Sequence, residues 1–259
     1  MTSMLPPANG AQDLIVYIHG FDITGNGYEM PQLVRYINEN VPGAAHCATW
    51  SPIYNSRDHS FLEATRLLMA VSQTLPTYRR RFAVCHSMGG VVARQLNLFG
   101  ANFETIVTLN TPHQGTAFWT SALTIATVRG GQSLLPNSSD LHALNRDDGH
   151  LRGRLHCVGV FYRGFVQTWP IPSIPWSTDH DDDTLIQRAS QMADGLENVA
   201  SRHWTRMDYG LAAPVQSIGW DSTHSPHAAL VEFPWGNHPH VRFDTAPMLA
   251  ALRTALRLA

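Results

Sequence analysis

A serine stands among small residues at the end of an apolar run, in the order Cys85-His86-Ser87-Met88-Gly89-Gly90. The run over residues 82–86 predicts a strand, and a helical pattern begins directly after the serine. A serine on so sharp a strand-to-helix turn presents its hydroxyl for nucleophilic attack, and its neighbours must be small because the turn is crowded. Ser87 is therefore the candidate nucleophile. Cys85 departs from the G-x-S-x-G pattern, which has glycine at that position.

A second candidate feature follows the first predicted strand, which covers residues 14–19 and leads into Gly20 and Phe21. Acyl transfer needs two backbone N–H groups that point at the developing oxyanion. The residue after the nucleophile, here Met88, supplies one of them. The loop after the first strand supplies the other, and Gly20 lets the backbone come close. Phe21 is therefore the predicted second donor.

Strands and helices must alternate to position these residues, and the hydrophobic pattern predicts that they do. Strands are predicted at residues 14–19, 44–50, 82–86, 105–109, 155–162 and 229–233. Helices are predicted at residues 31–40, 60–75, 89–99, 185–207 and 247–258. This order predicts an α/β fold with a six-stranded, mostly parallel sheet, in a single domain over residues 1–259.

Two inserts interrupt the alternation, at about residues 113–152 and 163–183. Loops of this length in a compact domain usually serve a function, as lids or as binding walls. The inserts carry many large apolar side chains, among them Trp119, Leu134, Phe165 and Trp176. Apolar walls near a nucleophile suit an acyl chain or an aromatic ester.

Three segments together resemble the bacterial lipases and esterases of the α/β-hydrolase superfamily. They are His19-Gly20-Phe21, the serine motif, and Thr111-Pro112-His113-Gln114-Gly115-Thr116, which is similar to the Thr-Pro-His-x-Gly-[Ser/Thr] stretch of lipases. The resemblance implies helices on both faces of the six-stranded sheet, a lid in the first insert, and a Ser–His–Asp triad in the chain order Ser, acid, His. It implies a carboxylic ester hydrolase (lipase or esterase) without a cofactor.

The resemblance also selects the base of this triad. In the family the histidine is followed by an apolar residue at +3 and a proline near +7. His240 has Phe243 and Pro247 at these positions, whereas the competing His238 has neither. His240 is therefore the expected base, and His238 the alternative.

The acid is chosen on the same ground. Asp183, with an aliphatic residue at +3 and Ser190 at +7, resembles the lipase pattern. Asp221 is the rival, because it ends a possible strand and lies closer to His240 in the sequence. Asp183 is favoured.

Charge and cysteine usage exclude several other functions. The net charge is −2 and all 18 basic residues are arginine, so no basic field exists to hold nucleic acid. Cys47, Cys85 and Cys157 lie in runs predicted as strands and are expected to be buried thiols. No His-Glu-x-x-His or paired-cysteine motif occurs, and the acidic run 179–183 is interpreted as a solvated loop, so no metal is predicted.

The expected partner is a small-molecule or lipid ester. No apolar stretch approaches the length of a membrane span. No basic and apolar leader is visible, which predicts a cytoplasmic location, with a trimmed secreted form as the alternative. Rival functions are an inactive hydrolase fold used as a binding module, or a thioesterase or amidase. A dinucleotide-binding fold is disfavoured because G-x-G-x-x-G does not follow the first strand. The acyl chain length and the oligomeric state stay open.

Overall fold

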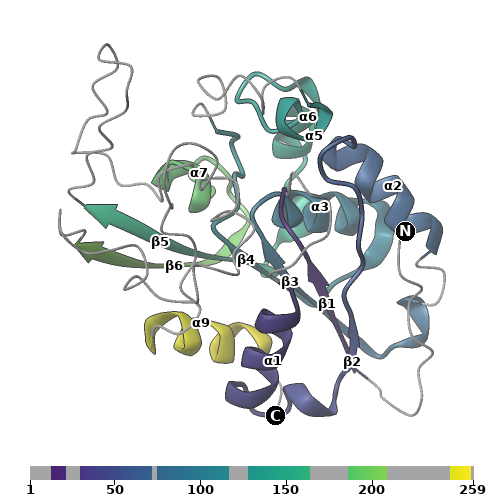
Figure 1. Ribbon diagram of the computed structural model, residues 1–259, viewed down its shortest axis with the longest axis vertical. Coiled ribbons are helices and arrows are strands. Elements are labelled where there is room, and N and C mark those ends of the chain that lie inside the picture. Colours follow the sequence, from purple (N-terminus) through teal and green to yellow (C-terminus); the bar gives the residue numbers. More distant parts are fainter. Residues whose placement is uncertain are drawn as a thin grey trace.

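The computed structural model describes residues 13–21, 30–71, 75–116, 128–163, 186–208 and 246–257. Six strands form one sheet in the order β2-β1-β3-β4-β5-β6, and each adjoining pair is parallel (Figure 1). The strands are β1 (Asp13–Ile18), β2 (Ala48–Trp50), β3 (Arg80–His86), β4 (Thr105–Leu109), β5 (Leu155–Arg163) and β6 (Val199–Asp208). The predicted six-stranded, mostly parallel sheet is thus confirmed.

The order of the strands fixes where a ligand can bind. The chain goes from β1 to β2 on one side and then crosses to β3 on the other side of β1. The strand order therefore reverses between β1 and β3. In open parallel sheets, ligands bind outside the carboxyl ends of the strands at such a reversal. The residues that follow β1 and β3 are His19 and Ser87.

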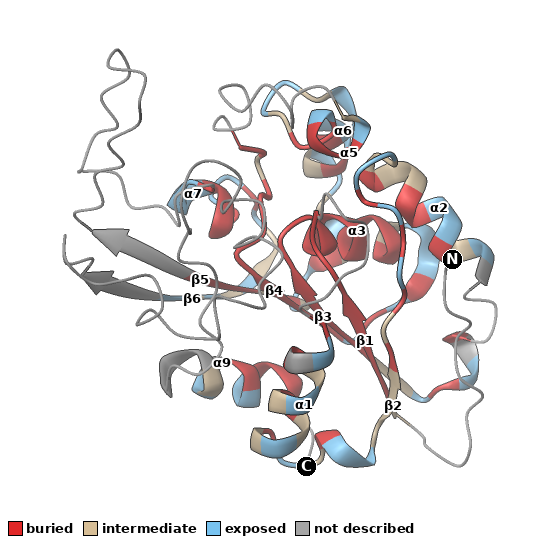
Figure 2. Ribbon diagram, in the orientation of Figure 1, coloured by how far each residue is buried: buried red, intermediate tan, exposed pale blue. Residues whose placement is uncertain are grey.

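Helices cover both faces of the sheet, as expected. Helices α1 (Met30–Asn40) and α9 (Ala246–Leu256) pack on one face, and α2 (Phe61–Val71) and α3 (Met88–Leu96) on the other (Figure 1). Successive side chains of β1 point to opposite faces, so Val16 joins the cluster under α2 and α3 while Tyr17 joins the one under α1 and α9. Central strands β1, β3 and β4 are buried along most of their length (Figure 2), as parallel strands covered on both faces must be.

The described part of the first predicted insert packs on the core. It contains α5 (Arg129–Gln132), α6 (Ser139–Arg146) and the short 3-10 helix η5 (Gly149–Leu151), on the same side of the sheet as α2 and α3 (Figure 1). The Ser138 hydroxyl caps α6 by accepting from the Leu141 N–H at 3.4 Å. Leu134, Leu141 and Leu144 are buried in the cluster under α3. Residues 117–127 and 164–185 of the two inserts lie outside the described residues.

The prediction of one helix over residues 185–207 is wrong. Only α7 (Arg188–Gln191) is helical in the described part of that range, and it is followed by β6. Gly195, at φ 89°, reverses the chain between them, and a glycine inside a helical pattern was the available sign of a break. The sixth strand is therefore β6. The predicted strand at residues 229–233 lies outside the described residues.

Three further boundaries differ from the predictions. The predicted strand 44–50 begins as the 3-10 turn η1 (Ala44–His46), so half-buried Cys47 precedes β2, whereas Cys85 and Cys157 are buried in β3 and β5. The helix predicted to reach residue 99 passes at Asn97 into the π-helical turn η3 (Asn97–Ala101). The helix predicted over residues 60–75 is α2, which covers Phe61–Val71, and residue 75 instead begins the short 3-10 helix η2 (Leu75–Thr77). No helix within the described ranges is both long and apolar enough to cross a bilayer.

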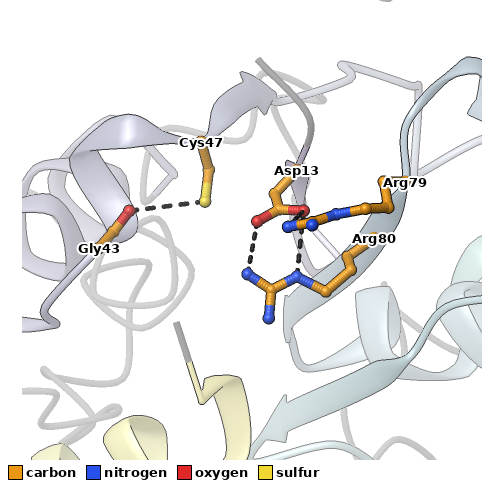
Figure 3. A network of polar contacts seen from close by, with 5 residues as sticks. All are labelled: Asp13, Gly43, Cys47, Arg79 and Arg80. Carbon is orange, nitrogen blue, oxygen red and sulfur yellow. Dashed lines mark hydrogen bonds and ion pairs between the residues drawn. The ribbon is translucent and has the colours of Figure 1, made fainter. Parts of the chain in front are cut away.

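An ion-pair cluster joins the amino ends of β1 and β3, at the end of the sheet opposite Ser87. Asp13 Oδ1 accepts from Arg80 Nε at 3.1 Å, and Asp13 Oδ2 accepts from Arg80 Nη2 at 2.5 Å (Figure 3). Arg79 Nη2 lies 3.5 Å from Asp13 Oδ1. The paired hydrogen bonds from Arg80 lower the pKa of the Asp13 carboxyl. This bidentate pair fixes the register of β1 on β3.

Candidate active site

Ser87 forms the turn between β3 and α3. Its backbone has φ 51° and ψ −126°, a conformation that costs a residue other than glycine about 1–3 kcal/mol. Two hydrogen bonds hold the turn in place: the Ser87 N–H donates to the Leu109 carbonyl at 2.9 Å, and the Gly90 N–H donates to the Ser87 carbonyl at 3.0 Å. The strained turn is therefore built into the junction of β3, β4 and α3.

The two glycines after Ser87 lie in close contact with neighbouring strands and loops, Gly89 with backbone and Gly90 with a side chain. A Cβ atom on Gly89 would lie 2.1 Å from the Ile18 carbonyl oxygen, and one on Gly90 would lie 2.2 Å from Thr111 Oγ1. At position 85, by contrast, the cysteine side chain fits into the apolar cluster beneath α3. Burial raises the pKa of the Cys85 thiol, so it stays protonated. The departure from the glycine pattern is therefore accommodated.

The hydroxyl of Ser87 is buried and forms no hydrogen bond with any described residue. Ser87 is 1% exposed, and its Oγ makes no hydrogen bond to any of the described residues. It lies at the start of α3, where backbone N–H groups lack intrahelical acceptors and the helix dipole is positive. A negative charge that develops beside Ser87 would be stabilised there.

The loop after β1 lies directly against Ser87. A Cβ atom on Gly20 would lie 2.8 Å from Ser87 Cβ, so only glycine permits this approach. His19 and Phe21 on either side are fully buried. We call His19, Gly20 and Phe21 the oxyanion loop, after the role predicted for the Phe21 N–H. The structure thus brings together three predicted site residues, Ser87, Met88 and Phe21.

The hydrogen bonds of the His19 side chain show which of its ring nitrogens carries the proton. Its Nε2 accepts from the Tyr54 N–H at 3.2 Å, because a backbone N–H can only donate. Its Nδ1 lies 2.8 Å from the Gly20 carbonyl oxygen and must therefore carry the proton and donate it. The His19 ring is thus held at both nitrogens, Nδ1 by the Gly20 carbonyl of the oxyanion loop and Nε2 by the Tyr54 N–H.

Helix α5 forms a wall behind Phe21. The Gly130 N–H donates to the Arg57 carbonyl at 3.0 Å, and a Cβ atom on Gly130 would lie 1.8 Å from the Ser56 carbonyl oxygen and 3.1 Å from Phe21 Cδ2. The Ser133 hydroxyl donates to the Gly130 carbonyl at 2.7 Å and accepts from the Phe61 N–H at 3.2 Å. Segment 54–57 therefore contacts the oxyanion loop on one side and α5 on the other.

A buried arginine orders the loop after β4. Arg94, on α3 and fully buried, donates to Asn145 Oδ1 at 2.7 Å, and its Nη1 lies 3.2 Å from His113 Nδ1. Asn145 Nδ2 donates in turn to the His113 carbonyl at 2.9 Å. Burial lowers the pKa of Arg94 to about 10, so the guanidinium remains charged at neutral pH. Arg94, His113 and Asn145 thus join α3, α6 and the loop after β4.

His113 is neutral in this network. Arg94 donates to Nδ1, so the ring proton lies on Nε2, which faces the Thr108 hydroxyl at 3.0 Å. Burial, together with the nearby positive charge of Arg94, holds the pKa of His113 well below its usual value. The histidine of the lipase-like Thr-Pro-His segment is therefore a structural residue in this protein.

The segment around α7 docks on the same loop through Ser190. The Ser190 hydroxyl donates to the Gly115 carbonyl at 2.6 Å and accepts from the Gln114 N–H at 3.0 Å. The His113 N–H donates to the Ser190 carbonyl at 3.2 Å. These bonds anchor α7 beside the loop whose first residues adjoin the Ser87 turn.

The remaining predicted site residues lie outside the described ranges. They are the two candidate bases, His240 and His238, and the two candidate acids, Asp183 and Asp221. The acidic run 179–183 lies outside them as well. Across the ranges that are described, no three His, Cys, Asp or Glu side chains gather closely enough to hold a metal ion. Sequence reasoning missed Tyr54, because nothing in its local sequence distinguishes it.

Comparison with known proteins bears on the fold. No family model matches this sequence, and neither does the sequence of any curated protein. The structure is similar to a gene product from Listeria innocua (TM-score 0.51, 13% identity, 76% of this chain and 85% of that one). It is also similar to the monoacylglycerol lipase of Paleococcus ferrophilus (TM-score 0.50, 10% identity, 85% of this chain and 93% of that one). A third similar structure is phospholipase PlaB from Legionella pneumophila (TM-score 0.50, 14% identity, 69% of this chain and 45% of that one). The chain spans less than half the length of PlaB.

Proposed function

We propose that this chain, which has the α/β-hydrolase fold, is a carboxylic ester hydrolase that acts through an acyl-enzyme on Ser87. The observation that carries the proposal is the strained backbone of Ser87, with its buried hydroxyl unbonded to any described residue at the start of α3. Strain of this kind persists only where the surrounding structure enforces it, and it gathers at active sites. Two of the similar structures are a monoacylglycerol lipase and a phospholipase, and this supports the proposal.

The reaction would proceed in two steps. Ser87 Oγ attacks the ester carbonyl carbon while His240 accepts its proton, and the alcohol leaves with that proton. Water then attacks the acyl-enzyme, His240 takes a proton from the water, and Ser87 is regenerated as the acid departs. The N–H groups of Phe21 and Met88 stabilise the oxyanion in both steps, and losing one such donor typically costs about 3 kcal/mol.

The base and the acid are assigned by the resemblance to lipases. His240 is the proposed base and His238 its alternative, so His240→Ala should abolish turnover whereas His238→Ala should leave most of it. The reverse result would transfer the role to His238. Either histidine variant that loses turnover should keep the thermal unfolding midpoint of the wild type.

Asp183 is the proposed acid, and the docking of its chain neighbours supports this choice. Ile186, three residues on, is buried, and Ser190 bonds the loop beside the Ser87 turn. Asp183→Asn should therefore lower kcat by about 10⁴, as loss of the correct histidine tautomer does in other triads. Asp221→Asn is the matched control, and a large loss in that variant alone would make Asp221 the acid.

Covalent labelling tests the whole proposal. A fluorophosphonate probe should label the wild type and fail to label Ser87→Ala, while circular dichroism shows both proteins folded. A catalytically inactive fold used as a binding module would leave the wild type unlabelled. Parallel assays of p-nitrophenyl esters, thioesters and amides would then separate an esterase from a thioesterase or an amidase.

The substrate class is a small-molecule or lipid ester, and the inserts are proposed to line its site. In the described part, α5 of the first insert forms the wall behind Phe21. A series of p-nitrophenyl esters of increasing acyl length would show how long a chain the site accepts. We further propose that residues 1–259 form a single domain, with lid-like inserts at about residues 113–152 and 163–183.

A further inference from the structure

We propose that Tyr54, between β2 and α2, is a positioning residue that holds the oxyanion loop in its working conformation through His19. The inference rests on the proposed function, because the direction of an oxyanion donor matters only to a reaction at Ser87. Tyr54 is separated from His19 by 35 residues in the sequence, and both side chains are buried.

Three contacts join Tyr54 to His19. The phenol hydroxyl of Tyr54 donates to the His19 carbonyl at 2.6 Å, and the Tyr54 N–H donates to His19 Nε2 at 3.2 Å. Their rings are stacked, with centroids 4.1 Å apart and an angle of 21° between the planes. Tyr54 thus contacts the backbone carbonyl, the Nε2 atom and the ring face of His19.

These contacts fix two successive peptide planes. A trans peptide is planar, so the carbonyl of one residue and the N–H of the next point in opposite directions within a single rigid unit. The Tyr54 hydroxyl holds the His19 carbonyl and therefore the plane of the His19–Gly20 peptide. His19 Nδ1–H holds the Gly20 carbonyl at 2.8 Å, and this sets the direction of the Phe21 N–H, the predicted donor.

The loop needs such fixing because glycine at its centre leaves it free to rotate. Gly20 is required for the close approach to Ser87 Cβ, and glycine has the widest choice of backbone angles. The wall of α5 behind Phe21 limits translation of the loop, since Gly130 already packs against that ring. The hydrogen bonds from Tyr54 to the His19 carbonyl and from His19 to the Gly20 carbonyl oppose rotation of the two peptide planes.

Tyr54→Phe isolates one of these contacts. It deletes the hydroxyl while the ring and the backbone N–H remain. We expect kcat and the rate of fluorophosphonate labelling to fall about tenfold, because small misplacements of catalytic groups cost that much or more. KM should stay unchanged, since the donor stabilises the oxyanion of the transition state and not the bound ester.

Tyr17→Phe is the matched control. Tyr17 is also a fully buried tyrosine, lies on β1 two residues before His19, and its hydroxyl has no hydrogen-bond partner among the described residues. The Tyr17→Phe variant should keep the wild-type kcat and the wild-type rate of fluorophosphonate labelling. Equal rates in the two variants would overturn the proposal, and so would a loss in Tyr54→Phe that only follows the unfolded fraction measured by circular dichroism.

Amide hydrogen exchange separates this proposal from the proposed function. Peptides that contain residues 19–21 should exchange faster in Tyr54→Phe than in Tyr17→Phe. A wild type that is not labelled at Ser87 would refute the esterase assignment and the positioning role with it. Faster exchange with unchanged labelling would show that Tyr54 holds the loop without serving catalysis, and would refute the positioning role alone.

A second variant applies if Tyr54→Phe does not fold. His19→Asn removes the acceptor for the Tyr54 N–H, and its kcat and labelling rate should show the same tenfold loss.

Discussion

Ser87 and Gly20 are in contact across the ends of two strands, and that contact fixes which residues each position accepts. Ser87 holds a left-handed φ of 51°, and a Cβ atom on Gly20 would lie 2.8 Å from Ser87 Cβ. The candidate nucleophile and the oxyanion loop are thus in close van der Waals contact. Substitutions here should impair chemistry more than folding.

Gly20→Ala is therefore expected to lower the labelling rate of Ser87 by about 100-fold, because the added methyl group must displace the oxyanion loop or the nucleophile. Labelling with a fluorophosphonate, measured as an initial rate, checks this. Gly149→Ala is the control, since nothing lies within 4 Å of a Cβ atom there. An unimpaired Gly20→Ala protein would show that the loop and Ser87 are not in contact during the reaction.

At the scale of elements, polar side chains decide how the loops and helices join. Arg94 and Asn145 connect α3 and α6 to the loop after β4, and Ser190 connects α7 to that same loop. Asp13 and Arg80 connect β1 to β3 at the opposite end of the sheet (Figure 3). These groups are buried or half-buried, so removing one partner leaves the other without a replacement for its hydrogen bond.

Asn145→Ala should destabilise the protein by about 3 kcal/mol, because it removes the acceptor of Nη2 on the buried Arg94 guanidinium and the side-chain donor to the His113 carbonyl. Urea unfolding followed by circular dichroism measures this. His142→Ala, an exposed position on the same helix, should change the free energy of unfolding by less than about 0.5 kcal/mol. Similar values for the two variants would mean that Asn145 does not hold Arg94.

Asp13→Asn should destabilise the protein by about 2 kcal/mol at pH 7, because hydrogen bonds to charged groups are worth that much. Arg80 lowers the pKa of Asp13 in the folded state, so this stabilisation is full above the unfolded pKa near 3.8 and is lost as the pH falls further. The unfolding free energies of wild type and variant should converge below pH 3.8. Arg79→Gln should have a smaller effect, since Arg79 is the more distant and more exposed partner.

At the scale of the whole molecule, two apolar clusters lie on the two faces of a parallel sheet, and several ionisable groups are buried or half-buried beside them. Burial lowers the pKa of His113, His150 and His156, with Arg94 adding to the effect for the first two. Each of these side chains is neutral in the fold and takes up a proton more readily once the chain unfolds. Acid should therefore favour the unfolded chain.

The free energy of unfolding should fall as the pH drops from 7 to 5, since a histidine with a lowered folded pKa stabilises fully only above its unfolded value near 6.5. Each such histidine adds a slope of up to about 1.4 kcal/mol per pH unit. His113→Asn, which keeps an acceptor for Arg94, should give a shallower slope. An unchanged slope in urea unfolding across this pH range would show that the pKa of His113 is the same in the folded and unfolded chain, and would contradict the prediction.

Much of the fold was predictable because the signals were local. Helices on both faces bury most of each central strand, so these strands contain short apolar runs, and the turn at Ser87 is marked by the glycines that follow it. Strand β6 was missed because polar residues such as Ser201, Arg202 and His203 interrupt its apolar pattern. Its assignment depends on pairing with β5, which no local pattern contains.

The sequence by itself determined the parallel sheet, and it predicted Ser87 as the nucleophile and the loop after β1 as the source of an oxyanion donor, because each of these signals lies in residues adjacent in the chain. Only the tertiary structure decided that His113 is structural, that Arg94 is buried, and that Tyr54 holds His19. These roles arise from contacts between residues as much as 51 positions apart, such as Arg94 with Asn145. The packing of helices on the sheet decides which residues distant in the sequence come into contact. Burial and hydrogen bonding can stabilise such a pair only after the fold has brought its members together.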